Sequence, residues 1–350
     1  MNSKKFMGIF LALTVCMLGC NAFINYKYDL YGVFDKDYSK YRYCYVNERY
    51  AKIDYLLHQG KGKYDTFIFG SSRSREINPK SFSPTTYNLA YSAGVPNDYL
   101  RDLKTLVTND VVPRKIYIGI DDFSYKRLPE EVHSNINFIG YGNYSENIKY
   151  KLALLFQKPK KDTIRYVFGK LNEPKMMYKV DTDGSIMGEP NETKIDWNTY
   201  VNDERFSKPS FYSEKNERIK STIAELKEIK SICDRYNIQL VLFMTPTHIT
   251  TYLSNDIKNL NKFKRELVQI NTFYDFSTIN FYTTNNYFWR ETSHARKVLL
   301  EKVTEALIRK EISKGYEYIL VTKDNVDKHL VKMLKDRENY SKTTHIQYIP

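Results

Sequence analysis

The sequence has few cysteines, and their positions exclude most cysteine chemistry. Only four occur in 350 residues, and two of them, Cys16 and Cys20, fall inside an apolar segment near the N-terminus. Cys44 and Cys233 remain for the rest of the chain, where they either pair as a disulfide or stay free and buried. No C-x-x-C pair and no histidine cluster is present. We therefore expect neither a metal site nor a cofactor.

Nucleic-acid-binding motifs are also missing. The sequence contains no zinc finger, no RNP-like aromatic motif and no clustered basic helix, so we do not expect a nucleic-acid partner. Yet 54 Lys and Arg outweigh 41 Asp and Glu, which gives a formal net charge of +13. This excess of positive charge either forms a generally basic, solvated surface or attracts a polyanion such as an anionic membrane face or an acidic wall polymer.

The sequence has one long apolar run, from Phe6 to Ile24, and two lysines precede this run. Its nineteen residues would span about 28 Å as a helix at about 1.5 Å each, close to the thickness of the bilayer core. Positive charge before the segment favours a cytoplasmic N-terminus and export of the rest, to the cell surface or the periplasm. We expect an uncleaved signal anchor over residues 1–24. Cleavage after Ala22 and lipidation of Cys20 are the alternatives.

The remaining chain has no internal repeat and no low-complexity linker, so we predict one extracytoplasmic domain over residues 25–350. Strand-like runs alternate with amphipathic helical patterns, which is typical of an α/β fold with a parallel sheet. The alternation is interrupted at about 126–215, which we interpret as an inserted cap of helices and loops over the strand ends. The predicted strands are Thr66–Phe69, Tyr87–Ala90, Lys115–Ile120, Leu240–Met244, Thr272–Phe276 and Tyr316–Val321.

One glycine and two serines follow the first predicted strand. Gly70, Ser71 and Ser72 come directly after Phe69 and precede Arg73. Ligands bind outside the carboxyl ends of strands in open α/β sheets, so a serine on such a turn is placed to act as a nucleophile. The G-x-S-x-G pattern of a nucleophile elbow is absent. A Gly-Ser-Ser turn also occurs as ordinary loop chemistry.

An acidic residue precedes a histidine by three positions near the other end of the chain, as Glu291 and His294. Such a pair at a helix start is commonly a capping feature. Combined with Ser72, it also supplies the groups of a Ser-His-acid triad. This combination resembles the SGNH/GDSL hydrolase superfamily, in which a serine lies in the first sequence block and a D-x-x-H block closes the triad. The similarity covers most of residues 25–340. It is closest to membrane-anchored, cell-surface members with a G-S-S first block, a group that includes the D-alanyl transfer protein of teichoic acid synthesis.

The resemblance implies an SGNH-like, flavodoxin-like three-layer sandwich around a parallel sheet. It implies that Ser72 is the nucleophile, that His294 is the base, and that Glu291 replaces the family's aspartate. It also implies an oxyanion hole formed by the backbone N–H groups of Ser72 and Gly94 and by the side chain at Asp121. The family has asparagine at this third position, and an ionised carboxylate cannot donate a hydrogen bond. Either Asp121 points away, or it is protonated, or the third donor is missing.

Arg73 and His248 are candidate substrate-binding residues. Arg73 either recognises an anionic or acyl-bearing polymer or forms a salt bridge with Asp121 or Asp122. His248 follows the most hydrophobic predicted strand of the exported part, in a P-x-H motif similar to that of the surface relatives. It either touches substrate or is a structural histidine bonded to the backbone.

These features lead us to expect a membrane-anchored, extracytoplasmic serine esterase or O-acyltransferase. Its substrate would be an acyl ester on a cell-surface polysaccharide or wall polymer, and a membrane-bound O-acyltransferase is a second candidate partner. The alternative is a non-catalytic accessory protein that kept the fold and binds a surface polymer during its assembly or modification. Asp121 favours the alternative, whereas Ser72 and His294 favour the enzyme.

Overall fold

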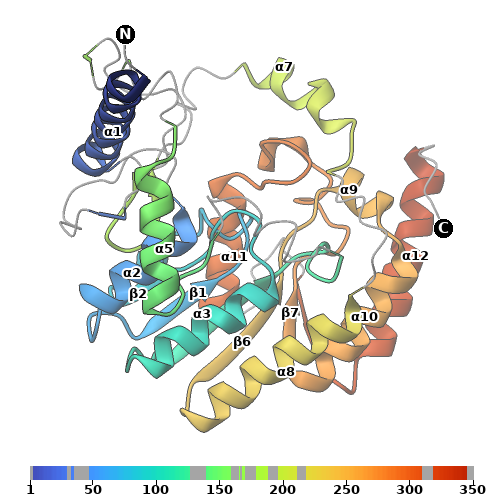
Figure 1. Ribbon diagram of the computed structural model, residues 1–350. Coiled ribbons are helices and arrows are strands. Elements are labelled where there is room, and N and C mark those ends of the chain that lie inside the picture. The colour runs from blue at the N-terminus through green and yellow to red at the C-terminus, as the bar shows by residue number, and fades with distance from the viewer. Residues whose placement is uncertain are drawn as a thin grey trace.

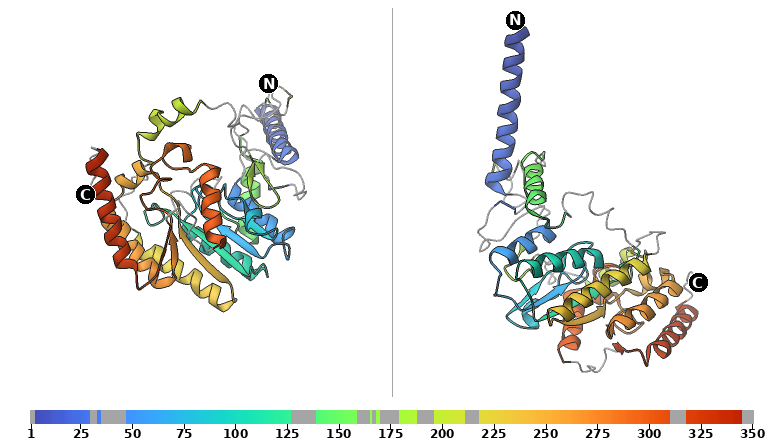
Figure 2. Two further views of the ribbon diagram at one scale, coloured as in Figure 1. Left: turned by 180° about the vertical axis from the view of Figure 1, so that it is seen from behind. Right: turned by 60° about the horizontal axis from the view of Figure 1, so that its bottom comes forward.

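The computed structural model describes residues 3–29, 33–34, 47–126, 139–158, 165, 168–169, 179–187, 196–210, 218–309 and 318–344. They form an α/β domain and an N-terminal apolar helix that projects from it (Figures 1 and 2). Cys233 is buried on a helix of this domain and is a free thiol, the second of the two alternatives considered for it. Cys44 lies outside the described residues.

Six strands form one sheet in the order β2-β1-β3-β6-β7-β8. The first five are parallel, and β8 is antiparallel to β7. All six predicted strands are present, and the predicted parallel sheet is confirmed in part, because the edge strand β8 runs antiparallel. The direction of a strand depends on the end of the sheet at which the chain enters it, and apolar patterning does not encode this. The strands are β1 (Thr66–Phe69), β2 (Thr86–Asn88), β3 (Lys115–Ile120), β6 (Gln239–Met244), β7 (Phe273–Asp275) and β8 (Ile319–Val321), with a separate antiparallel pair, β4 (Lys179–Val180) and β5 (Ile186–Met187).

Helices cover both faces of the six-stranded sheet (Figure 1). Those labelled α2, α3, α8, α10 and α12 contribute to the core on one face, and α11 packs on the other. The helices are α1 (Ser3–Tyr28), α2 (Glu48–His58), α3 (Pro96–Thr108), α5 (Tyr144–Leu155), α7 (Trp197–Val201), α8 (Ile219–Arg235), α9 (Ile249–Ser254), α10 (Ile257–Ile270), α11 (Lys297–Arg309) and α12 (Val326–Thr344), with 3-10 turns η1 (Pro79–Ser81), η4 (Glu204–Phe206) and η5 (Asn286–Phe288).

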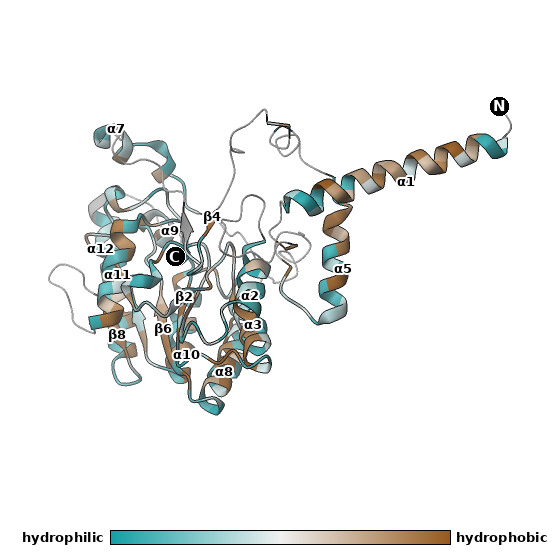
Figure 3. Cartoon of the chain, turned by 90° about the vertical axis from the view of Figure 1, so that its left-hand side faces the viewer, coloured by the Kyte–Doolittle hydropathy of each residue, from teal (hydrophilic) through white to brown (hydrophobic). Residues whose placement is uncertain are grey.

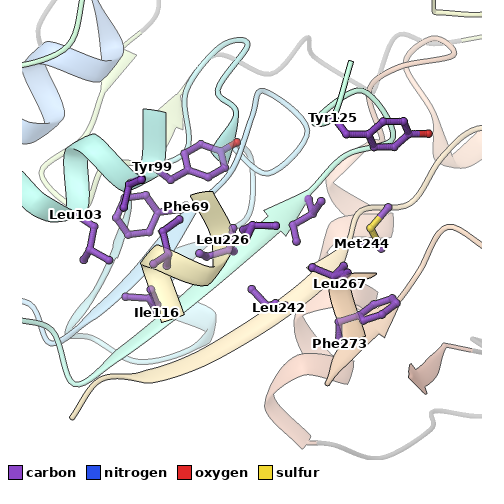
Figure 4. Close-up of a cluster of buried hydrophobic side chains, with 14 of the residues drawn as sticks. Phe69, Tyr99, Leu103, Ile116, Tyr125, Leu226, Leu242, Met244, Leu267 and Phe273 are labelled. Carbon is purple, nitrogen blue, oxygen red and sulfur yellow. The ribbon is translucent and has the colours of Figure 1, made fainter. Parts of the chain in front are cut away.

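The two-residue period of the strands divides the core between these faces. On β3, Ile116 belongs to the larger cluster, and its neighbour Tyr117 belongs to the smaller cluster beneath α11. Figure 4 shows the larger cluster, in which Leu242 of β6 shares the core with Leu103 of α3 and Leu226 of α8. Because both faces of the central strands are buried, their sequences are continuously apolar, and this is why they could be predicted.

Among the described residues, α1 is the one helix long and apolar enough to cross a membrane, with a mean hydropathy of 2.1 over its best 18-residue window. None of that window is buried against the rest of the chain. Figures 2 and 3 show α1 extending away from the domain, with α5 beside its C-terminal end. The predicted N-terminal apolar helix is thus confirmed as a helix.

The described parts of the 126–215 insertion lie in three different places. Helix α5 lies beside α1. The β4–β5 hairpin flanks the edge of the sheet, where the Asn88 N–H donates to the Asp183 carbonyl at 2.9 Å. Helix α7 lies beside the segment after β7, where the Tyr200 hydroxyl donates to the Trp289 carbonyl at 2.8 Å. The β4–β5 hairpin therefore lies at the carboxyl end of β2, and α7 lies beside the loop after β7. The single cap over 126–215 stays a prediction.

Candidate active site

The turn that follows β1 is tightly folded, and its shape requires Gly70. A Cβ at this position would lie 2.5 Å from the side chain of Ser74. At the end of the neighbouring strand β2, the Asn88 amide donates to three carbonyls of the turn, those of Ser74, Arg75 and Ile77, at 2.8–3.2 Å. One side chain therefore fixes the turn to the carboxyl edge of the sheet.

The two serines of this turn have different surroundings. Ser71 is fully buried, and its Oγ accepts a hydrogen bond from the backbone N–H of Arg73 at 3.1 Å. Ser72 is partly exposed, and its Oγ lies 2.8 Å from Nε2 of His294. The structure thus brings Ser72, and not Ser71, to the histidine.

Glu291 holds His294 from the other side of the imidazole ring. Its Oε1 is hydrogen-bonded to Nδ1 of His294 and accepts from the backbone N–H of the same residue at 3.0 Å. Its Oε2 accepts from the Ser293 N–H at 2.7 Å. Since an ionised carboxylate only accepts, Nδ1 carries the proton and Nε2 is left to accept from the Ser72 hydroxyl. Glu291 therefore caps the turn and orients the ring at the same time.

The surroundings of Glu291 keep it ionised. Burial raises the pKa of its carboxyl, but the hydrogen bond and charge of His294 and two backbone N–H groups outweigh burial, so the net pKa lies below the ordinary value. An ionised carboxylate at this position stabilises the imidazolium that forms when His294 takes a proton. The side chains of His294 and Glu291 are 36% and 37% exposed, so the site opens to solvent.

Two further contacts tie the serine turn to the histidine segment. Arg290 donates to the Glu76 carboxylate at 2.6 Å, and Nε of Arg73 donates to the Ser293 hydroxyl at 3.4 Å. Each contact joins a residue close to Ser72 with a residue next to Glu291 or His294. The distance between Ser72 and His294 is therefore fixed by neighbours on both segments.

Gly94 lies beside the serine turn, in the loop after β2. A Cβ there would lie 2.8 Å from the rings of Tyr91 and Tyr99 and 3.1 Å from the Gly70 carbonyl oxygen, so crowding requires glycine. Its N–H makes a long turn bond, 3.4 Å, to the Tyr91 carbonyl. Ala93 has a φ of 62°, a left-handed conformation that non-glycine residues seldom adopt and that is concentrated at functional sites. The oxyanion role of Gly94 stays a prediction.

Asp121 is buried at the end of β3 and points into the core. Its carboxylate accepts a hydrogen bond from the Thr245 hydroxyl and lies 4.0 Å from Nη1 of Arg73. Burial raises the pKa of Asp121, and Arg73 together with the hydroxyls of Ser71 and Thr245 offsets only part of that increase. Because Oδ1 accepts from Thr245, we expect Asp121 not to act as the third oxyanion donor, and this expectation stays a prediction.

Arg73 forms an ion pair and is not presented to substrate. Its guanidinium is buried, donates to the Asp122 carboxylate and lies 5.1 Å from the centre of the Phe123 ring. Burial raises the pKa of Asp122, but Arg73, Lys126 and the Asn255 amide lower it more, so the net pKa is below the ordinary value. The salt-bridge alternative for Arg73 thus replaces the predicted substrate contact.

His248 makes the contacts of a structural residue, the second of the two alternatives considered for it. It is the N-cap of α9, where Nδ1 accepts from the Thr250 N–H at 3.2 Å, and its Nε2 lies 2.8 Å from the amide oxygen of Asn286. This pattern defines a neutral imidazole with the proton on Nε2. Burial lowers the pKa of His248, with Asn286 and Glu291 acting in the opposite direction. The ring is enclosed by Phe206 and Trp289.

Helix α2 supplies site contacts that the sequence did not reveal. Its Glu48 accepts from Arg75 of the serine turn at 3.0 Å and from the Ser92 N–H at 2.9 Å. One turn later, Lys52 is fully buried and donates to the Ala90 carbonyl. These charged side chains join the serine turn to the loop that carries Gly94. Charged residues in a helix are normally expected to be solvated, so the burial of these side chains could not be predicted from the sequence.

The described residues contain no group of three or more His, Cys, Asp and Glu side chains placed to hold a metal ion. No protein-family model and no curated protein matches the chain.

Proposed function

We propose that the protein is an SGNH-like serine esterase or O-acyltransferase that is anchored to the membrane by α1 and acts on its extracytoplasmic side. The observation that carries this proposal is the 2.8 Å contact between Oγ of Ser72 and Nε2 of His294, with Glu291 bonded to Nδ1. The strand order supports it, since the five parallel strands follow the flavodoxin-like order and Ser72 follows the first of them.

In this reaction the Ser72 hydroxyl attacks the carbonyl carbon of an acyl ester. Its proton passes to Nε2 of His294, and Glu291 stabilises the charged imidazole. The bond between the carbonyl carbon and the alcohol oxygen then breaks, His294 returns the proton to that oxygen, and an acyl-serine remains. Water resolves the acyl-serine in a hydrolase, whereas a hydroxyl of an acceptor resolves it in a transferase. In both cases His294 takes the proton of the incoming group.

Two backbone donors are proposed for the oxyanion, the N–H groups of Ser72 and Gly94. Among the described residues, the Ser72 N–H makes no hydrogen bond, so it is available. Asp121 supplies no third donor. The loss of one oxyanion donor costs roughly 10²- to 10³-fold in kcat, so we expect slow turnover.

An acyl ester on a surface polymer fits the surroundings of the site. The triad side chains are open to solvent, which suits a group that protrudes from a long chain better than a small enclosed substrate. Partly exposed rings lie near His294, where the tilted rings of Trp197 and Tyr287 have their centres 4.8 Å apart and the Arg296 guanidinium lies over both. Aromatic faces of this kind offer apolar contact together with polar edges, as sugar rings require.

The test is acyl release from an O-acetylated polysaccharide by the full-length protein in detergent, with and without an added acceptor alcohol. We expect release with wild type and none with Ser72→Ala. Ser71→Ala, which removes the neighbouring hydroxyl, is the matched control and should retain activity. Equal release by wild type and Ser72→Ala would contradict the proposal.

The second candidate is a non-catalytic accessory protein that binds a surface polymer, or a membrane-bound O-acyltransferase, through the basic surface. The absence of a third donor at Asp121 favours it. A folded wild type that releases no acyl group, yet binds an anionic glycan with strong salt dependence that is unchanged in Ser72→Ala, would support this candidate over the enzyme.

A further inference from the structure

Helix α5 exposes a row of apolar side chains. Tyr144, Ile148, Leu152 and Phe156 follow one another at four-residue spacing and are 83%, 40%, 49% and 53% exposed. This spacing places them along one side of the helix, next to the side that is buried by Tyr150 and Leu154. Contiguous exposed apolar surface of this kind marks an interaction site.

The C-terminal end of α5 is attached to the anchor helix. Side-chain amides of Asn21 and Asn25 on α1 donate to the carbonyls of Leu155 and Gln157 at 2.8–3.3 Å. The last carbonyls of a helix have no partner within it, so α1 supplies the cap that α5 lacks. Asn25 is fully buried in this contact, which fixes the position of α5 along α1.

This position is at the end of the apolar run that we assign to the membrane. The run extends to Ile24, so Asn21 lies inside its last turn. Since a residue adds about 1.5 Å along a helix, the α5 carbonyls that Asn21 and Asn25 bind are level with the edge of the hydrocarbon core. On α1 itself, Phe23 and Tyr26 are exposed at this level and Lys27 follows them, as expected for residues at a membrane interface.

We propose that α5 is an interfacial helix that lies in the surface of the bilayer that α1 crosses, with Ile148, Leu152 and Phe156 in contact with lipid. Lys149 and Lys158 on the same helix and just after it would reach the headgroups. The occupant of the apolar row is lipid because the end of α5 that carries Leu152 is bonded to α1, a helix whose own exposed surface is apolar (Figure 3).

This contact sets the height of the catalytic site above the membrane. The Tyr150 ring of α5 packs 4.8 Å from that of Tyr50 on α2, and the Asn47 amide donates to the Tyr150 hydroxyl at 3.0 Å. From α2, Glu48 bonds Arg75 in the serine turn. Successive contacts thus connect the bilayer to α5, α5 to α2, and α2 to the serine turn. These contacts would restrict the site to substrates that lie close to the membrane. The inference rests on the proposed anchoring by α1 and not on the esterase chemistry.

The experiment is quenching of tryptophan fluorescence by brominated lipids, with the full-length protein reconstituted in phosphatidylcholine and phosphatidylglycerol vesicles. Leu152→Trp tests α5, Phe10→Trp tests α1, and Val331→Trp, an exposed position on α12 far from α1 in Figure 1, is the matched control. The emission of the two native tryptophans is measured in the wild-type protein and subtracted from that of each variant. All three positions are exposed, so the larger ring does not disturb the core.

We expect the added emission of Leu152→Trp to be quenched most strongly by lipids whose bromines lie near the headgroups. The added emission of Phe10→Trp should be quenched most strongly by lipids whose bromines lie deeper in the bilayer. Val331→Trp should lose none. If Leu152→Trp behaves like Val331→Trp while Phe10→Trp is quenched, α5 does not contact lipid and the inference is wrong, with anchoring intact. If Phe10→Trp is not quenched either, anchoring and inference fail together. The esterase proposal is tested separately by acyl release.

Discussion

Nε2 of His294 lies 2.8 Å from Oγ of Ser72 although 222 positions separate the two residues in the sequence. The parallel direction of β1 and β7 allows this contact, since the loops after both strands emerge at the same edge of the sheet. The contact is oriented, because Glu291 fixes the ring tautomer so that the acceptor nitrogen faces the serine. The predictions below follow from this arrangement and from the charged groups that surround it.

Glu291→Gln should abolish most of the catalytic activity without unfolding the site. A glutamine amide can donate to Nδ1 and so stabilise the wrong imidazole tautomer, with the proton on Nε2 facing Ser72. In the Ser-His-Asp triad of chymotrypsin-like proteases the equivalent change lowers kcat roughly 10⁴-fold. The measurement is kcat for aryl acetate hydrolysis, with circular dichroism as the folding control. A variant that retains the wild-type rate would show that Glu291 is only a turn cap.

Asp121→Asn should not increase the esterase rate. It should change the way in which the free energy of unfolding depends on pH. Burial raises the pKa of Asp121 above 3.8. The folded state then holds the proton to higher pH than the unfolded state does, and the free energy of unfolding falls as pH rises from about 4 through the raised pKa. The asparagine variant lacks this loss. Urea unfolding between pH 3 and pH 7 compares the two proteins.

Asp122→Asn is the matched control for that series. The pKa of Asp122 is lowered, so its contribution to stability is present above the ordinary carboxyl pKa and is lost as pH falls through the lower value. Removal of its charge takes away the carboxylate nearest to the buried Arg73 guanidinium, with Asp121 farther off at 4.0 Å, and should cost about 3–5 kcal/mol at neutral pH. Equal effects of the two substitutions on stability would contradict the different environments assigned to Asp121 and Asp122.

Lys52→Met should remove a rise of stability with pH. Burial lowers the pKa of Lys52 from 10.5 to about 7, with Glu48 and Asp183 opposing the change and Arg75 adding to it. Between about pH 7 and about pH 10 the unfolded chain holds a proton that the folded chain has released, so the free energy of unfolding increases with pH. Methionine does not titrate. Unfolding curves at pH 7 and pH 9 should separate further for wild type than for Lys52→Met, and equal separations would count against a buried, proton-releasing lysine.

His248→Ala should lower stability and leave substrate affinity unchanged. The substitution leaves the Thr250 N–H and the Asn286 amide oxygen without their partner, at a cost of about 1–3 kcal/mol. Thermal unfolding and KM for a polymeric ester are the two readouts. A raised KM at unchanged stability would restore His248 to the substrate site and contradict its structural role.

The contact of Ser72 with His294 could be predicted from the sequence because each of the two segments carries its own local signal. A buried strand followed by Gly70 and two serines defines a turn, and the spacing of Glu291 and His294 suits one carboxylate that both caps and orients. For Arg73 and His248, the sequence could not decide between the two alternatives considered for each residue. Each is a polar residue at a strand end, and whether it faces solvent or a buried partner depends on residues far away in the sequence.

The contacts of α2 and α5 could not be predicted from the sequence for a different reason. Lys52 is buried because Ala90 offers it a carbonyl, and Asn25 is buried because α5 ends beside it. Neither partner is close in sequence. Periodicity reports which side of a helix is apolar, but it does not report which polar side chains find a buried partner.

The most direct test is covalent labelling of the full-length protein in detergent with a fluorophosphonate probe, followed by mass spectrometry of the labelled peptide. The probe reacts only with a serine whose hydroxyl is activated by a base. The account predicts labelling of wild type and Ser71→Ala at Ser72, and none of Ser72→Ala or His294→Ala. An absence of labelling in folded wild type, or labelling that survives in His294→Ala, would contradict an activated Ser72–His294 pair.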